Sequence, residues 1–508
     1  MLVKVKCISF RGITPVEVTV EVYVNNRGLP SFDIVGLADK SVEESKQRVK
    51  TAFLSSNYDF RDKKITVNLA PADLHKEGTY YDLPIAVGIF CAQKNIKISE
   101  DALFFGELSL DGSLRSTART FLLGLFAKET GFRRIYIPSP NVTEASMLNG
   151  VEVIGISNLD DLFKHLQYGS NIATKYDKAR VQDKSVPASI ENTLDSIQGQ
   201  VQAKRALVIS AAGGHNLLLT GTPGTGKTML AKALPEILSD LSEEESLEVT
   251  KIYSYIGELN QEEPLIKRRP FRSPHHTSSF AGVIGGGNPI SPGEITKAHR
   301  GILFLDEMPE FSRNILEALR QPVQDGYINL TRSRTTASFP ASFMLVGACN
   351  PCPCGYSGHP TKECVCSAAK ISWYKRRLSG PILDRIDLFA KTVPLSDKEV
   401  LEFTKCLSDG TGQDQSRALV TEARKIQAKR FSKIGIYTNA EMTNSHIKHF
   451  CTMDSQAEIL LHQAMERFAL SPRSYFKIIK IAKTIADLEH NALITSAHIA
   501  EALQYRDR

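Results

Sequence analysis

The sequence of 508 residues has no apolar run long enough to cross a membrane. Its longest candidate, residues 83–92, falls far short of the roughly 20 residues that a transmembrane helix needs. The first residues, MLVKVKCISFRG, also lack the apolar core of a signal peptide, so we expect a cytoplasmic protein without a membrane partner. In that compartment the nine cysteines are expected to be free thiols or metal ligands rather than disulfides.

A strong charge of either sign, internal repeats and low-complexity tracts are also missing. The net charge of +6 is too small to identify a partner, although a ring of identical subunits would concentrate any basic patch at its centre. The content of 42% apolar and 23% charged residues is that of a folded globular protein. The length suits about three domains.

The order of strand-like and helical segments predicts a multidomain α/β protein. Residues 1–168 indicate an α+β domain without a phosphate loop, and residues 169–191 a polar linker. Residues 192–394 suit a doubly wound α/β core, and residues 395–508 a mostly helical C-terminal domain. The expected strands span 16–24, 64–68, 134–138, 151–156, 216–219, 302–305 and 342–349, and the expected helices include 41–55 and 120–130.

A glycine-rich run, GTPGTGKT at 221–228, follows a predicted strand and precedes a predicted helix. Its glycines allow backbone N–H groups to wrap phosphates, and the helix N-terminus adds a favourable field. We expect Lys227 to reach the outer phosphates and the Thr228 hydroxyl to hold Mg²⁺. The predicted nucleotide-binding residues are Gly221, Thr222, Pro223, Gly224, Thr225, Gly226, Lys227 and Thr228.

A second run, GILFLDE at 301–307, ends a predicted buried strand in two carboxylates. Open α/β sheets bind ligands at the carboxyl ends of their strands. Asp306 is therefore an expected magnesium ligand, and Glu307 is expected to activate the attacking water. Together the two runs predict hydrolysis of ATP rather than a plain glycine-rich turn.

Three further positions resemble those of AAA+ ring ATPases. Asn350 ends a predicted strand, where these proteins place the sensor 1 residue that orients the attacking water. SGPILDRID at 379–387 resembles the segment that carries an arginine finger in helicase-type and chelatase-type members, here Arg385, which acts across a subunit boundary and implies a hexameric ring. SPRSYF at 471–476 resembles the sensor 2 motif and implies a catalytic role for Arg473. The alternative for both arginines is a structural ion pair.

Longer stretches resemble the magnesium-chelatase-like YifB/ComM family over essentially the whole chain. They are RPFRSPHHTSS at 269–279, PGEITKAHRGILFLDE at 292–307, NPCPCG at 350–355 and LSGPILDRID at 378–387. The resemblance implies an AAA+ core with a helical C-terminal lid, and a hexameric DNA helicase that promotes branch migration in natural transformation. Its partners would be single-stranded or branched DNA and recombination proteins. The open alternatives are a chelatase-type motor that remodels a protein partner and an ATP-dependent protease.

The N-terminal region resembles the catalytic domain of Lon proteases, which has a ribosomal S5 domain 2-like fold. Lon proteases use a Ser–Lys dyad. The corresponding stretches are GTYYDLPIA at 78–86, which contains no serine, and LRSTARTFLLG at 114–124, which contains no lysine. Covalent peptide hydrolysis therefore lacks its nucleophile and base, and we expect a scaffold or a module that binds a partner or nucleic acid.

Two Cys-x-Cys pairs nine residues apart predict a metal site, with Cys352, Cys354, Cys364 and Cys366 as ligands. Four thiolates can close a tetrahedral structural zinc site that leaves no position open for water. We expect a zinc-binding insert at 349–366, in which Cys349 is a buried fifth thiol.

The stretch at 326–340 alternates apolar and polar residues and predicts a β-hairpin with a basic tip, at Arg332 and Arg334. Helicase-type AAA+ rings have a hairpin here that points into the pore, where arginines hold phosphates without reading sequence. The alternative is a hairpin tip that contacts only solvent.

The glycine-rich segment 279–293 is expected to be a mobile loop. His275 and His276 are expected to be hydrogen-bonding residues rather than metal ligands.

Overall fold

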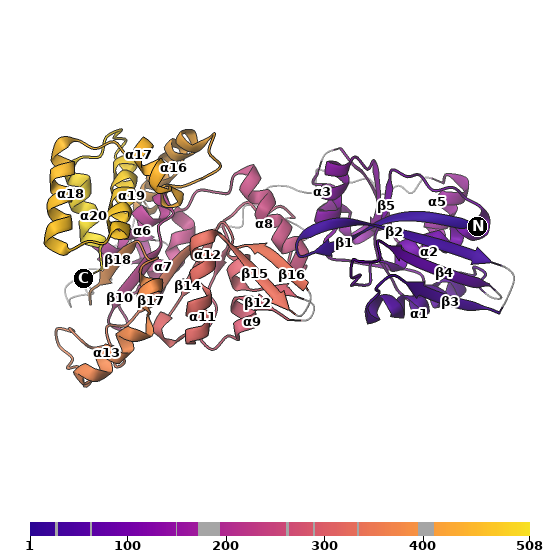
Figure 1. Ribbon diagram of the computed structural model, residues 1–508, viewed down its shortest axis with the longest axis horizontal. Helices are drawn as coiled ribbons and strands as arrows, with labels where there is room; N and C mark the ends of the chain where they lie inside the picture. The colour runs from indigo at the N-terminus through magenta and orange to yellow at the C-terminus, as the bar shows by residue number, and fades with distance from the viewer. Residues whose placement is uncertain are drawn as a thin grey trace. The chain divides into compact units, whose positions relative to one another are not determined.

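The computed structural model describes residues 1–25, 29–60, 63–148, 150–170, 194–260, 264–287, 290–332, 335–394 and 411–507. The chain divides into two compact units, which Figure 1 shows from one side. Unit 1 comprises Met1–Lys184 and Glu243–Ile266, and unit 2 comprises Ser185–Ser242 and Lys267–Arg508. Every helix in the described ranges is too short or too polar to span a bilayer.

A mixed seven-stranded sheet forms the core of unit 1, in the order β3-β4-β2-β1-β5-β8-β9. Its antiparallel strands are β1 (Leu2–Arg11), β2 (Thr14–Asn25) and β4 (Lys64–Ala70). Its parallel additions are β3 (Ser31–Val35), β5 (Ala102–Phe104), β8 (Arg134–Pro138) and β9 (Glu152–Ile156). A separate strand pair is β6 (Glu107–Leu108) with β7 (Leu114–Arg115). Unit 1 has the expected α+β composition, whereas its resemblance to the Lon catalytic domain stays a prediction.

Five helices of unit 1 come from the N-terminal part of the chain: α1 (Lys40–Ser55), α2 (Asp82–Lys94), α3 (Thr120–Thr130), α4 (Val142–Ala145) and α5 (Leu159–Tyr168). α2 is buried on nearly all sides, from Asp82 through Ala92. A helix that is surrounded by protein has apolar residues on all sides of its axis. The apolar run at 83–92 is explained by this burial inside unit 1.

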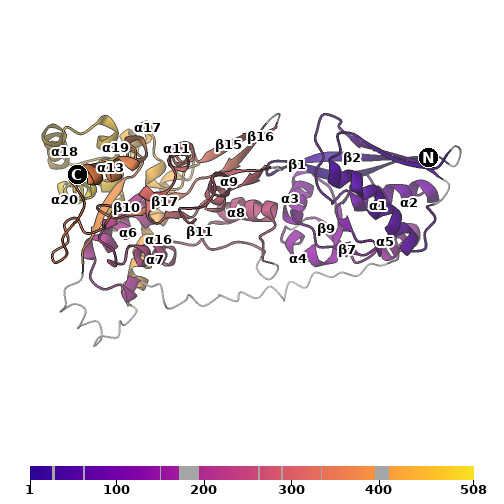
Figure 2. The same cartoon turned by 90° about the horizontal axis from the view of Figure 1, so that it is seen from below.

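A sixth helix, α8 (Glu243–Ile256), also belongs to unit 1, although it follows the first strand of unit 2 in the sequence. It packs beside α3, as Figure 2 also shows. The guanidinium of Arg119 lies 4.3 Å from the ring centroid of Tyr255, and its Nε donates to the Tyr255 carbonyl at 3.1 Å. The Ser254 hydroxyl donates to Glu144 at 2.7 Å. The sequence predicts one continuous core over 192–394, so this excursion of the chain into unit 1 is a difference from expectation.

A five-stranded parallel sheet forms the core of unit 2, in the order β11-β14-β17-β10-β18. Its strands are β10 (Leu217–Gly221), β11 (Phe271–Arg272), β14 (Ile302–Leu305), β17 (Met344–Cys349) and β18 (Leu388–Thr392). The predicted strand at 302–305 is confirmed, and it is buried along its whole length as parallel strands between helical layers are. Because β17 lies between β10 and β14, the carboxyl ends of these three strands meet at one edge.

Helices surround this sheet and continue to the C-terminus. They are α6 (Val201–Gly213), α7 (Lys227–Ile237), α10 (Glu294–Lys297), α11 (Arg313–Ala318), α12 (Arg320–Asp325), α13 (Ala368–Arg377), α14 (Gly380–Leu383), α16 (Thr411–Phe431), α17 (Asn444–Phe450), α18 (Ser455–Phe468), α19 (Pro472–Leu488) and α20 (Ser496–Ala502). α16 and α19 pack on α6, so the apolar faces of the C-terminal helices join the core of unit 2. A parallel α/β core followed by helices agrees with the predicted fold class.

The predicted hairpin is confirmed as β15 (Tyr327–Arg332) and β16 (Thr335–Pro340), paired from Tyr327 opposite Pro340 to Arg332 opposite Thr335. The side chain of Arg332 and the whole of Arg334 lie outside the described part of the chain.

The glycine-rich segment, expected as a mobile loop, forms α9 (Phe280–Val283) and the strand pair β12 (Gly285–Gly286) and β13 (Ser291–Pro292). Gly285 has φ +115° and a Cβ there would lie 2.6 Å from Leu330 of β15. The absence of a side chain therefore lets this segment pack against the hairpin.

Candidate functional site

The glycine-rich loop connects β10 to α7 and surrounds the side chain of Lys227. The Lys227 ammonium group donates to the carbonyls of Gly221 at 2.7 Å and Thr222 at 2.9 Å, and to Oδ1 of Asn350 at 3.1 Å. Burial lowers the pKa of Lys227. These three acceptors are uncharged, so they hold the ammonium group without cancelling the charge that would attract a phosphate.

Glycines make this loop possible for steric reasons. Gly224 and Gly226 have φ +79° and +84°, a region that residues with a side chain rarely adopt. A Cβ on Gly221 would lie 2.0 Å from the Thr392 hydroxyl of β18. The backbone N–H groups of the loop can therefore approach a phosphate closely.

The residues predicted to hold Mg²⁺ lie next to each other. The Thr228 hydroxyl donates to Oδ2 of Asp306 at 2.8 Å, which joins the start of α7 to the end of β14. Neighbouring oxygen ligands of an octahedral Mg²⁺, each about 2.1 Å from the ion, lie about 3 Å apart. The spacing and the chemistry of these two oxygens therefore fit a magnesium ion.

Glu307 follows Asp306 in the left-handed backbone conformation, with φ +49°. Its N–H donates to Oδ1 of Asp306 at 2.9 Å, and its carboxylate lies 3.7 Å from Nδ1 of His276. The ring of His276 also contacts the edge of Phe311. The sequence does not single out His276 as a site residue; it follows β11, and only the pairing of β11 with β14 brings it to Glu307.

The two predicted arginines lie together, and no described contact joins them to Lys227. The Arg385 guanidinium donates to the carbonyls of Arg320 and Pro381 and to the Gln324 side chain. Burial lowers the pKa of Arg385, and the neighbouring charge of Arg473 lowers it further. In the described ranges no carboxylate hydrogen-bonds to Arg385, although the nearby charges of Asp384 and Asp325 act to raise its pKa.

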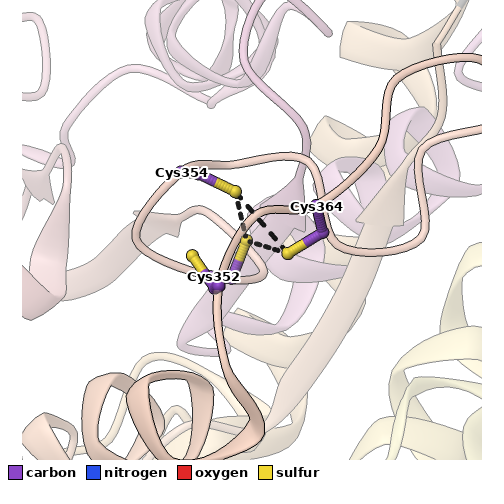
Figure 3. Close-up of side chains that lie close together, drawn as sticks. Cys352, Cys354 and Cys364 are labelled. Carbon is purple, nitrogen blue, oxygen red and sulfur yellow. Dashed lines mark hydrogen bonds between the residues drawn. The ribbon is translucent and has the colours of Figure 1, made fainter.

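The four predicted zinc ligands converge in the loop between β17 and α13. Figure 3 shows the sulfur atoms of Cys352, Cys354 and Cys364 turned toward one another, 3.4 to 3.6 Å apart. With Cys366, all four sulfur atoms lie within 4.8 Å of one another. A disulfide would bring two of them to about 2.05 Å, whereas four sulfurs about 2.3 Å from a tetrahedral zinc lie about 3.8 Å apart. The cluster is therefore compatible with a structural zinc ion.

Backbone N–H groups also point at these sulfur atoms. The N–H of Ser357 donates to Cys352 at 3.3 Å, and the N–H of Tyr356, together with the neighbouring thiols, lowers the pKa of Cys354 to about 6. Such donors stabilise the thiolate form that binds metal. Burial and the neighbouring thiols raise the pKa values of Cys364 and Cys366. Cys349 is buried on β17, where burial raises the pKa of its thiol, and it is not part of the cluster.

The cysteine loop packs directly on the phosphate loop. A Cβ on Gly355, which follows Cys354, would lie 2.5 Å from the ring of Pro223. Because Asn350 precedes the cysteines and its side chain accepts from Lys227, the cysteine loop and the phosphate loop form one structural region.

Unit 1 has an acidic residue in the stretch that resembles the Lon nucleophile region. Asp82 is fully buried at the start of α2, and Arg48 of α1 contacts both of its carboxylate oxygens, at 2.7 and 3.1 Å. The N–H of Leu108 also donates to it at 3.2 Å. These contacts use both carboxylate oxygens of Asp82 and connect α2 to α1. Asp82 therefore stabilises the packing of the two helices, and it lacks the exposure that a nucleophile needs.

Three features meet at one edge of the parallel sheet: the phosphate loop, the carboxylates of Asp306 and Glu307, and the polar residue Asn350. The strand that leads to Asn350, β17, lies between the other two strands. This arrangement defines unit 2 as the core of an AAA+ P-loop ATPase. A family model described as "Magnesium chelatase, subunit ChlI" matches residues 193–401. "Subunit ChlI of Mg-chelatase" matches residues 20–141, and "Magnesium chelatase, subunit ChlI C-terminal" matches residues 411–506.

Similar proteins match nearly the full chain. Competence protein ComM of Haemophilus influenzae is 41% identical over 503 residues, which cover 97% of this chain and 95% of that protein. YifB of Escherichia coli K12 is 39% identical over 499 residues, with the same coverage. The chain therefore belongs to the YifB/ComM family of magnesium-chelatase-like AAA+ proteins. This family suggests ATPase activity and implies ATP and Mg²⁺.

Proposed function

We propose that this protein is an ATP-driven DNA motor, a homo-hexamer that moves single-stranded or branched DNA during recombination. The observation that carries the ATPase part is the joining of Lys227 to Asn350 and of Thr228 to Asp306 at one sheet edge. The DNA part is supported by the printed name of the Haemophilus influenzae relative, a competence protein, and by the family resemblance, which implies natural transformation.

In this proposal each residue of the cluster has one task. Lys227 binds the outer phosphates of ATP, and Thr228 with Asp306 holds Mg²⁺, which when bound neutralises phosphate charge. Asn350 orients the attacking water. Glu307, whose side chain is 54% exposed, accepts the proton of that water on its carboxylate.

Arg385 and Arg473 act on the nucleotide of a neighbouring subunit. No described contact joins either arginine to Lys227, and the hydrogen-bond acceptors of Arg385 are uncharged, so its guanidinium suits the phosphates of another chain. Hydrolysis then requires two subunits at each site, which accounts for a ring. The cysteine cluster holds a structural zinc ion in the same proposal.

A chelatase-type motor is the second candidate, because the matching family models are described as magnesium chelatase. The magnesium-chelatase subunit ChlI of Nephroselmis olivacea is 26% identical, but over only 31% of this chain and 50% of that protein. The nearly full-length match at 41% identity to a competence protein therefore favours the DNA motor.

The test is the ATPase rate of the full chain with and without forked and single-stranded DNA. We expect DNA to stimulate hydrolysis. The double variant Arg332→Ala, Arg334→Ala should keep the basal rate and lose most of the stimulation, because the hairpin tip loses its phosphate contacts. Thr336→Ala, which changes the same hairpin without changing its charge, is the matched control. An ATPase that ignores every form of DNA would exclude the DNA motor, and a double variant stimulated like wild type would exclude the hairpin contact.

A further inference from the structure

The most exposed large aromatic surface near the catalytic edge belongs to α13. Its Trp373, the one tryptophan of the chain, is 63% exposed. Tryptophan is usually mostly buried, because its large ring gains much from leaving water. Figure 1 shows α13 projecting from unit 2, and the guanidinium of Arg377 lies 5.4 Å from the centroid of the Trp373 ring.

Exposed cations lie on the same helix, before and after Trp373 in the sequence. Lys370, Lys375 and Arg376 are all exposed on α13, and the helix has no acidic residue. Among the described residues no carboxylate pairs with any of the three. Arg377 differs, because it binds Glu310 at 2.8 Å and thereby holds the helix against the segment that follows β14. A hollow of about 490 Å³ runs along the helix, lined by Lys375, Arg376 and small or apolar residues.

The inner side of the same helix reaches the catalytic edge. Tyr374 is buried, and its hydroxyl lies close enough to the backbone of Asn350 for that backbone to act on its pKa. Asn350 in turn accepts from Lys227. A ligand that moves or orders α13 can therefore act on the nucleotide site through one buried side chain.

We propose that the outer face of α13 is a single-stranded DNA site, in which Trp373 stacks on an unpaired base and Lys370, Lys375 and Arg376 bind neighbouring phosphates. Aromatic rings between cations are the arrangement that single-strand sites use, because every base offers a stacking face and every nucleotide a phosphate. A duplex hides its base faces, so it lacks the stacking partner. A second copy of the same face would bring like charges together. This inference rests on the DNA motor proposed above.

The single tryptophan allows a direct test in the full chain without a label. Oligothymidylate should quench the emission of Trp373 in a saturable manner, and a blunt duplex of equal length should quench it less. In a separate anisotropy measurement with a labelled oligonucleotide, Trp373→Ala should weaken binding about 5- to 150-fold, the range for loss of one stacked base.

The contribution of the cationic side chains can be tested by the dependence of DNA affinity on salt concentration. Lys375→Ala with Arg376→Ala removes two phosphate contacts, so the slope of log affinity against log salt should become shallower by about 1.4. Lys425→Ala with Lys429→Ala, an exposed pair on α16, is the matched control and should keep the wild-type slope.

Four results would overturn the inference. If wild-type protein binds the oligonucleotide but its emission does not change, or if Trp373→Ala binds like wild type, the α13 site is wrong and the DNA motor stands. If emission changes with protein concentration and not with DNA, a second copy covers this face. If wild-type protein binds no DNA at all, the DNA motor fails and this site with it.

Discussion

Glu307 has a backbone conformation that a residue with a side chain adopts only under constraint. Its φ of +49° comes directly after the fully buried strand β14 and before Met308, which is also buried. Strain of this kind costs of the order of 1–3 kcal/mol and persists where the surrounding structure determines it. Here it turns the carboxylate toward solvent and His276 rather than into the core.

At this scale the first prediction separates binding from hydrolysis. Lys227→Ala should weaken ATP binding, because the phosphates lose their cation. Glu307→Gln should bind ATP as wild type does and hydrolyse it about 10²- to 10⁴-fold more slowly, the usual effect of removing a general base. Nucleotide binding and phosphate release, measured separately, check both. Hydrolysis at the wild-type rate by Glu307→Gln would refute the assignment.

The second prediction concerns His276 as a positioning residue. His276→Ala should lower kcat by up to about 100-fold, the size of effect that a misplaced catalytic group can have, and change the KM for ATP little. His276→Gln should restore part of the rate, because an amide can still hydrogen-bond the carboxylate. His275→Ala is the comparison variant: His275 is exposed, contacts Thr277 and packs on the His276 ring with centroids 4.2 Å apart, but no described contact joins it to Glu307, so its loss should have the smaller effect. Equal effects of the two alanine variants would contradict the assignment.

At the scale of elements, the geometry of the cysteine loop is compatible with a bound metal ion. The loop contains little apolar surface of its own. Its four sulfur atoms nevertheless lie within 4.8 Å of one another without a disulfide bond between them. Because Gly355 packs against Pro223, the shape of this loop also limits where the phosphate loop can lie.

The third prediction is therefore that the protein binds one zinc ion per chain, measured by metal analysis after purification without chelator. Cys354→Ser with Cys364→Ser should lose the zinc and lower both the Tm and the affinity for ATP, because structural zinc contributes folding free energy directly. Cys349→Ser should keep the zinc. A metal-free wild-type protein with undiminished stability would contradict the site.

At the scale of the whole molecule, the chain enters unit 1 twice. Residues 243–266 leave the ATPase unit, form α8 on unit 1 and return. Tyr255, which is 9% exposed, contacts Phe10 and Arg119, so α8 is part of the packing of unit 1 rather than an appendage of unit 2.

The fourth prediction follows from this connection. A truncated protein that starts at residue 192 and keeps 243–266 should aggregate, because α8 loses its partners and exposes apolar surface. The same truncation with 243–266 replaced by a Gly-Ser linker should stay monodisperse in size-exclusion chromatography and retain nucleotide binding. If both fragments behave alike, the contacts of α8 with unit 1 contribute little.

Local features of the protein could be read from the sequence by itself. The phosphate loop at 221–228, the strand at 302–305, the hairpin at 326–340 and the cysteine pairs were all predictable. In each case the determining interactions lie within about a dozen residues: glycine conformations, period-two alternation, or ligand spacing.

Only the tertiary structure decided which of these features meet. The pairing of β11 with β14 brings His276 to Glu307, and α8 joins a unit formed mainly by Met1–Lys184, on the far side of β10 and α7 in the sequence. The same is true of Arg385 beside Arg473. A sequence pattern shows which face of a helix or strand is apolar, but not which other element covers that face. The free energy of burying apolar surface has no preferred direction, so many partners could cover the same face. The partner is selected by the packing of the whole chain.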